Sequence, residues 1–221
     1  LAIVNDVITV TFTAIEAIGT KVVTFSSAGV AINASRVSYV NTAGNTWTAS
    51  YTAVGSDTDG AVTYSIVVGD LAGNPGVAVT TGTGSVTFDD TDPARTSVTV
   101  ASNNSLVTHA KSGNAVTVEL TTDVAVSQPV VVFKSGGATL NNASGRVITY
   151  TNTNSPNKTE WSAAYTVDAA DTDGLVSFDI DFSDLAGNAA PTVTSVTDTS
   201  SVVVDTTAPT LTSVEIASSF S

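Results

Sequence analysis

The most constraining feature of this chain is a repeat within it. Residues 85–105 read SVTFDDTDPARTSVTVASNNS, and residues 201–221 read SVVVDTTAPTLTSVEIASSFS, with no gap between the two segments. Shorter matches occur in the same order: WTASYTA (47–53) with WSAAYTV (161–167), DTDG at 57–60 and 171–174, and DLAGN at 70–74 and 184–188. Self-similarity over such a length indicates repeated structural units. We therefore expect two copies of one small domain.

The two copies are out of phase with the chain. Copy one spans 1–93, copy two spans 94–209, and residues 210–221 form a spare segment. The segment TSVTVAS (96–102) that starts copy two has no counterpart in copy one, whereas TSVEIAS (212–218) has no domain after it. If Ser221 were joined to Leu1, the repeat would continue there as it does from Ser105 to Leu106. This pattern is expected for one period excised from an array, or for a subunit that completes its neighbour.

Hydrophobic residues alternate with polar ones throughout both copies. Ile8, Val10 and Phe12 share one face, and Trp161, Ala163 and Tyr165 share another. This period of two predicts strands with one buried face. In copy two, strands are expected at 96–102, 115–121, 129–134, 146–151, 160–167, 174–182 and about 201–205. About seven short strands per copy favour an all-β fold. We predict two tandem immunoglobulin-like antiparallel β-sandwiches, the first lacking its own first strand, plus a spare C-terminal strand.

Composition argues against several classes of function. The net charge of −13 disfavours nucleic acid as a partner, because phosphate binding needs a basic surface. There is no cysteine, and the one histidine, His109, has no counterpart in copy one, so a catalytic triad or a histidine-rich zinc site is not expected. No apolar run approaches membrane-spanning length, so membrane insertion is not expected. We expect the chain not to be an enzyme.

The acidic residues gather in loops between the predicted strands. Calcium prefers about six to eight oxygen ligands, which such loops can supply. In a seven-strand sandwich the second-to-third and sixth-to-seventh strand loops share one end, which the linker DDTDP (89–93) can face. The predicted metal ligands are Asp89, Asp90, Asp92, Asp123 and Asp184 with Asn188 at the junction, and Glu16, Asp70 and Asn74 in copy one. The DTDG acids Asp57, Asp59, Asp171 and Asp173 belong to the opposite ends, where plain turns are an equal alternative.

The motifs TFTAIEAI, DTDG, DLAGN and DTTAP, in this order, resemble tandem bacterial immunoglobulin-like repeats of large surface proteins and adhesins. In such families the repeats form extended stalks, and calcium often stiffens the junctions between domains. The resemblance implies that Asp205 with DTTAP, like Asp89 with DDTDP, forms a domain-joining linker, and Asp205 is a further predicted metal ligand. It implies an extracellular or cell-surface location and possible surface glycans as partners.

Residues 210–221 carry the pattern of a first strand. Val214 and Ile216 occupy the places of Val98 and Val100, and Thr212 begins the match at Thr96. An uncovered sheet edge in copy one needs a partner strand. We therefore expect identical units to join head to tail, as separate subunits or as one continuous array, in an extracellular filament or adhesin stalk.

The alternative function is a carbohydrate- or ligand-binding accessory module of a secreted protein. It predicts an exposed aromatic platform, whereas Trp47 and Trp161 fall on inward strand positions. Asn33, Asn103, Asn142 and Asn157 begin glycosylation sequons, which a chain rich in Asn, Ser and Thr also contains by chance.

Overall fold

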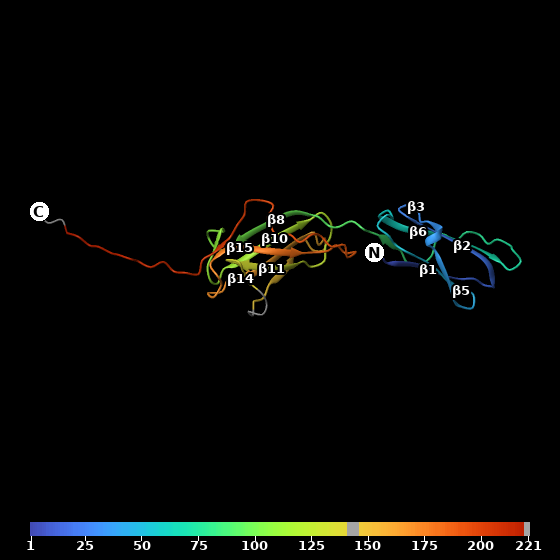
Figure 1. Ribbon diagram of the computed structural model, residues 1–221, viewed down its shortest axis with the longest axis horizontal. Helices are drawn as coiled ribbons and strands as arrows, with labels where there is room; N and C mark the ends of the chain where they lie inside the picture. The colour runs from blue at the N-terminus through green and yellow to red at the C-terminus, as the bar shows by residue number, and fades with distance from the viewer. Residues whose placement is uncertain (141–145, 219–221) are drawn as a thin grey trace. The chain divides into compact units, whose positions relative to one another are not determined.

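The chain divides into two units in the structure. The computed structural model describes residues 1–140 and 146–218, so the sequon at Asn142 and residues 219–221 of the spare segment lie outside the described residues. Unit 1 comprises Leu1–Pro93 with Ser183–Ala189, and unit 2 comprises Ala94–Phe182 with Ala190–Ser221 (Figure 1). Both units are built from strands, as the alternating sequence pattern predicts.

Unit 2 contains two packed sheets. Its strands are β8 (Arg95–Ser102), β9 (His109–Ala110), β10 (Ala115–Thr122), β11 (Val130–Ser135), β12 (Ala138–Leu140), β13 (Thr149–Asn152), β14 (Glu160–Thr166), β15 (Gly174–Asp181) and β16 (Val203–Val204). One sheet has the order β13-β14-β10-β8 and the other the order β12-β11-β15-β16-β9. All neighbours are antiparallel except β16 and β9, which are parallel. This arrangement is that of an immunoglobulin-like sandwich.

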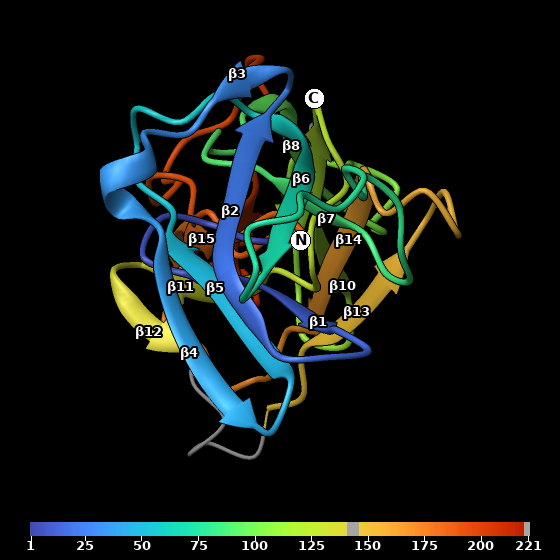
Figure 2. The ribbon, with the colours of Figure 1, turned by 90° about the vertical axis from the view of Figure 1, so that its right-hand side faces the viewer.

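Unit 1 repeats most of this arrangement. Its elements are β1 (Val7–Thr13), β2 (Ile18–Ser27), β3 (Val30–Ala31), the short 3-10 helix η1 (Ala34–Arg36), β4 (Ser38–Ala43), β5 (Thr46–Thr52), β6 (Gly60–Asp70) and β7 (Val86–Phe88). The sheets have the orders β1-β5-β4 and β3-β2-β6-β7, and Figure 2 shows β2 beside β6 and β4 beside β5. By position along the chain, β1 corresponds to β10. Within the described residues, β10 has β8 on its second side, whereas β1 has no strand there.

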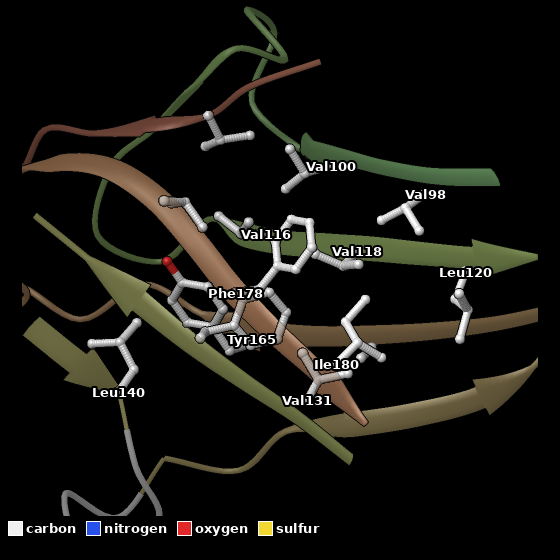
Figure 3. Close-up of a cluster of buried hydrophobic side chains, with 14 of the residues drawn as sticks. Val98, Val100, Val116, Val118, Leu120, Val131, Leu140, Tyr165, Phe178 and Ile180 are labelled. Carbon is white, nitrogen blue, oxygen red and sulfur yellow. The ribbon is translucent and has the colours of Figure 1, made fainter. Parts of the chain in front are cut away.

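Each unit has its own hydrophobic core between the two sheets. The core of unit 2 takes Val98 and Val100 from β8, Val116 and Val118 from β10, and larger residues from the facing strands, as Figure 3 shows. Phe133 and Tyr165 pack with ring centroids 4.8 Å apart, and the matching pair Phe25 and Tyr51 in unit 1 lies 4.9 Å apart. Such tilted aromatic pairs add to the energy of burial. The alternation in sequence thus positions one inward side chain in every two.

A tyrosine links the two sheets along one side of each sandwich. In unit 1 the backbone N–H of Val23 on β2 donates to the Tyr39 hydroxyl on β4 at 2.9 Å. In unit 2 the N–H of Val131 on β11 donates to the Tyr150 hydroxyl on β13 at 3.1 Å. The hydrogen bond joins an edge strand of one sheet to a strand of the other. This side of the sandwich is therefore tied in the same way in both units.

The glycine of each DTDG segment starts a long strand in a conformation that other residues avoid. Gly60 and Gly174 have φ values of 142° and 141°. A Cβ on Gly174 would lie 2.8 Å from the Cα of Gly136, and one on Gly60 would lie 2.9 Å from the Cβ of Ala28. Both the backbone angle and the close packing against the opposite turn require glycine.

Candidate functional site

Unit 1 has a groove along the open side of β1. The groove has a volume of about 430 Å³ and is lined by Ile8–Thr11 of β1, by Phe25, Val62 and Tyr64 of the facing sheet, and by residues 82–86. It therefore runs between the edge of one sheet and the chain segment that leads into β7. Both apolar residues and residues with hydroxyl groups line it.

Matched positions show how much of the unit 1 core this groove uncovers. In unit 2 the residues at these positions are buried: Val118, Leu120, Val176, Phe178 and Val202 are 1%, 3%, 6%, 4% and 0% exposed. In unit 1 their counterparts are only partly buried: Val10, Phe12, Val62, Tyr64 and Val86. The sequence pattern is the same in both units. The difference in burial therefore comes from what covers these side chains.

In unit 2 the cover is β8. Val98 and Val100 are 0% and 4% exposed, and they lie opposite Leu120 and Val118 of β10. The other edge of β8 also has partners, because its backbone bonds to the segment before β16. Val98 N–H donates to Thr197 Oγ1 at 2.9 Å, and Val100 N–H donates to Ser200 Oγ at 3.0 Å. Strand β8 thus closes the second side of the sandwich.

The predicted assembly residues lie outside both cores. Thr212, Val214 and Ile216 are exposed, with Val214 81% and Ile216 98% exposed, and every residue from 207 to 218 is exposed. Within the described residues this segment belongs to no strand. It therefore presents its alternating apolar side chains to solvent.

The two DLAGN loops form compact turns around their aspartates. In the second, Asp184 Oδ1 accepts the N–H groups of Ala186, Gly187 and Asn188 at 2.6–2.9 Å, and both Asp184 and Asn188 are buried. Asn188 Nδ2 also donates to the carbonyl oxygen of Asp89 at 2.9 Å. The carboxylate and amide are therefore largely engaged with neighbouring polar groups.

In the first DLAGN loop the matching aspartate, Asp70, is only half-buried. Asp70 accepts two hydrogen bonds from Asn74, which lower the pKa of its carboxyl group below the ordinary value. Glu16 lies beside them, because all three line a hollow of about 370 Å³ with Ile15, Ile18 and Pro75. The structure therefore brings together the Glu16, Asp70 and Asn74 that the sequence analysis grouped in copy one.

The linker acids bind local backbone and hydroxyl groups. Asp123 Oδ1 accepts the N–H of Ala94 at 2.8 Å, and Asp89 and Asp205 each accept an N–H two residues further on. The carboxylates of Asp59 and Asp173 hold the start of each linker: Asp59 accepts from Asp90 N–H and Thr91 Oγ1, and Asp173 accepts from Thr206 and Thr207. These bonds lower the pKa of Asp173, the N–H of Thr206 first among them.

Calcium remains a prediction from the sequence. In the described part of the chain, no three His, Cys, Asp or Glu residues are gathered as a metal site would need. The predicted junction set, Asp89, Asp90, Asp92, Asp123 and Asp184, draws on both units, so the structure of either unit by itself does not test it. The local hydrogen bonds described above already explain the positions of most of these acids.

The first aspartate of each DTDG segment forms an ion pair that the sequence analysis missed. Arg36 bonds Asp57 through two guanidinium nitrogens at 2.6 Å, and Arg146 pairs with Asp171 at 2.5 Å. The hydrogen bonds from Arg36 hold the pKa of Asp57 below its ordinary value. The signal was present in the sequence, because Arg36 lies between β2 and β4, and Arg146 lies between the corresponding strands β11 and β13.

The remaining sequence candidates lie as follows. Both tryptophans are half-buried: Trp161 packs against the unit 2 core, and the ring centroid of Trp47 lies 3.8 Å from Lys21 Nζ. Exposed His109 contacts the hydroxyl of Thr108 at 3.0 Å. Sequence reasoning also missed Tyr39, Tyr150, Thr197 and Ser200, whose hydroxyls bond backbone groups far away in sequence. Within the described residues, none of the helices has the length and apolar character needed to cross a membrane.

Comparisons with known proteins give only weak similarities. No protein-family model matches the chain, and no curated protein matches it. Among solved structures, the I-band fragment I67–I69 from titin is similar with a TM-score of 0.45 and 11% identity; it covers 93% of this chain, which spans 61% of that fragment. A structure of Rst D1-D2 gives a TM-score of 0.34 and 16% identity, covering 93% of this chain and 94% of that one. Similarities at this level carry no conclusion about this chain.

Proposed function

We propose that this chain is a structural subunit of an extracellular head-to-tail filament or adhesin stalk. In this assembly the C-terminal segment 210–221 of one unit completes the first domain of the next. The observation that carries the proposal is the groove beside β1, which occupies the place that β8 fills in unit 2. A contact between two different surfaces of identical units can repeat from one unit to the next. It gives a filament unless the rotation between units closes a ring.

The segment fits the groove by the pattern of its side chains. Val214 and Ile216 match Val98 and Val100, which are buried in unit 2, and they are separated by the same single residue. Placed like β8, Val214 would lie opposite Phe12 and Ile216 opposite Val10, the two residues that β1 leaves partly buried. Burying one such aliphatic side chain contributes roughly 1.5–3 kcal/mol. Addition of a strand to an exposed sheet edge is an established mode of peptide recognition.

The same contact serves separate subunits and a continuous array. In the array, the strand would come from the preceding repeat of one chain, and in the polymer it would come from another copy. Boiling native assemblies in detergent separates the two cases. A non-covalent polymer falls to a band at 22.2 kDa, the mass of this chain, whereas a continuous array does not. The structural role needs no catalytic residue, and calcium at the acidic linkers would be an added stiffening element.

The test is assembly of the purified chain. Replacing both assembly residues (Val214→Asp and Ile216→Asp) would place two carboxylates in the apolar groove, where burial without a partner is costly. We expect the parent chain to form concentration-dependent polymers in sedimentation velocity and electron microscopy, and the double variant to stay monomeric. The matched control is Leu106→Asp with Val107→Asp, two residues 56% and 55% exposed, which makes the same charge change elsewhere. Polymers of normal length from the first variant would overturn the proposal.

A further inference from the structure

An inserted strand has two edges, and β1 provides partners for only one of them. Ordering an exposed segment costs roughly 1–2 kcal/mol per residue of backbone entropy. Two buried aliphatic side chains offset only part of that cost over a segment of this length. The second edge of the inserted strand must therefore also find hydrogen-bond partners, or it would leave backbone N–H groups without them inside the groove.

Unit 2 shows how this second edge is satisfied. The N–H groups of Val98 and Val100 point away from β10, toward the hydroxyls of Thr197 and Ser200. Thr197 also donates its own N–H to the carbonyl oxygen of Val98 at 2.8 Å. The segment before β16 therefore holds β8 through side-chain hydroxyls rather than through a regular strand. This contact joins residues about 100 positions apart, so it is a tertiary contact and not a local turn.

The corresponding segment of unit 1, residues 80–85, is rich in hydroxyls and lines the groove. Val79 bridges Ile66 just as Val193 bridges Ile180, so Thr83 stands four residues after its valine, as Thr197 does after Val193. Thr83 and Ser85 are among the lining residues of the groove, and both are exposed. By sequence Ser85 matches Ser201, the residue after Ser200, and both Thr83 and Ser85 line the groove that an inserted strand would enter.

Two glycines let this segment lie close to the groove. A Cβ on Gly82 would overlap the hydroxyl oxygen of Tyr64, and Gly84 has a φ of 85°, in the left-handed region. The segment from Val193 to Ser201 in unit 2 is two residues longer than the matching segment from Val79 to Ser85 in unit 1. Its Val196 packs against the unit 2 core. The shorter glycine-containing segment therefore leaves open the space that an incoming strand would fill.

We propose that residues 80–85 form a hydroxyl clasp, in which Thr83 and Ser85 accept the backbone N–H groups of Val214 and Ile216 from a second copy of this chain. This inference rests on the proposed function and specifies its partner contacts. Glu215, whose N–H faces the other way, would bond β1. Because alternate residues of the segment face opposite edges, the clasp and β1 protect alternate backbone amides of the inserted strand.

The test uses a labelled peptide, TLTSVEIAS, with the sequence of residues 210–218. The acceptor is the full chain carrying Val214→Asp and Ile216→Asp, which cannot donate its own segment. The peptide's affinity is measured by fluorescence anisotropy, and the exchange of its backbone amides is followed by NMR. We expect the Val214 and Ile216 amides of the bound peptide to be protected together with that of Glu215. Free exchange at Val214 and Ile216 beside a protected Glu215 would overturn the clasp and leave strand insertion standing.

The acceptor variant Thr83→Val with Ser85→Ala removes both hydroxyls and keeps the side-chain size similar. We expect it to weaken peptide binding roughly tenfold and to release the Val214 and Ile216 amides only, because each hydrogen bond contributes a modest net energy. Thr87→Val, on β7 outside the groove lining, is the control and should bind as the parent acceptor does. Equal affinity of parent and double variant would contradict the clasp, and a peptide that does not bind the parent acceptor would refute the proposed function as well.

Discussion

Two matched pairs of apolar residues, one in β8 and one in the spare segment, should respond differently when they are changed to alanine. The change in β8 should lower the stability of the monomer, and the change in the spare segment should weaken assembly. In unit 2, Val98 and Val100 are 0% and 4% exposed, so changing both to alanine removes buried methyl groups and leaves a cavity. Each lost methyl or methylene is worth about 0.8 kcal/mol in burial alone. Two valines lose four such groups in total, which together with the cavity gives roughly 3–5 kcal/mol of lost stability.

In the spare segment the matched residues are 81% and 98% exposed, so Val214→Ala with Ile216→Ala should change the stability of the monomer by less than about 0.5 kcal/mol. The same change should weaken polymer formation strongly, because it removes the side chains that fill the groove. Each unit contains a single tryptophan, so unfolding in urea can be followed for unit 2 alone through Trp161 in a Trp47→Phe background. A monomer destabilised equally by both pairs of changes would refute the assignment of 212–218 to another copy's groove.

Two further predictions concern contacts within the units, and a third concerns the predicted calcium site. Replacing Arg36 with methionine should destabilise unit 1 by roughly 1–3 kcal/mol at pH 7. The pKa of Asp57 is lowered because Arg36 stabilises its ionised form, so the stability difference between the parent and the variant should shrink as the pH falls below about 4. Urea titrations at several pH values check this. Gly174→Ala should cost roughly 1–3 kcal/mol, more than Gly113→Ala, whose added Cβ would meet nothing within 4 Å although φ is 88°, and thermal melting compares them. Calcium should raise the melting temperature of the chain, and chelator should reverse the rise; unchanged melting with no heat of binding in calorimetry would contradict the predicted site.

The sequence predicted what depends on short-range pattern. The alternation of apolar residues located the long strands of unit 2 closely: the predicted 96–102 and 115–121 are observed as Arg95–Ser102 and Ala115–Thr122. The predicted strand at 146–151 begins later, at Thr149, while Arg146 before it pairs with Asp171. The short strands β3, β9 and β12 were not predicted, because two or three residues carry too little alternation to be recognised.

The parts of the site that were missed depend on contacts between distant residues. The repeat and the spare pattern at 212–218 pointed to the edge of β1, but nothing local marks Thr197 or Ser200 as partners of β8. The role of Asp59 and Asp173 in holding the linkers likewise needs the fold, since each joins residues more than 30 positions apart. Loop acids read as metal ligands can also be ordinary hydrogen-bond acceptors, and sequence spacing alone does not separate the two.

A short parallel pairing between an early segment and the strand before the linker recurs in each unit, and it affects how the unit would respond to a pulling force. In unit 2, Val203 N–H bonds Thr108 and Asp205 N–H bonds Ala110, both at 2.9 Å; in unit 1, Ala2 bonds Thr87 and Asp89 in the same manner at 2.9 and 3.0 Å. Parallel strands pulled from opposite ends slide along each other, so these bonds are loaded together rather than opened one after another. A stalk of such units would therefore resist stretching by shear at these short pairs, which are the mechanical links of the fold.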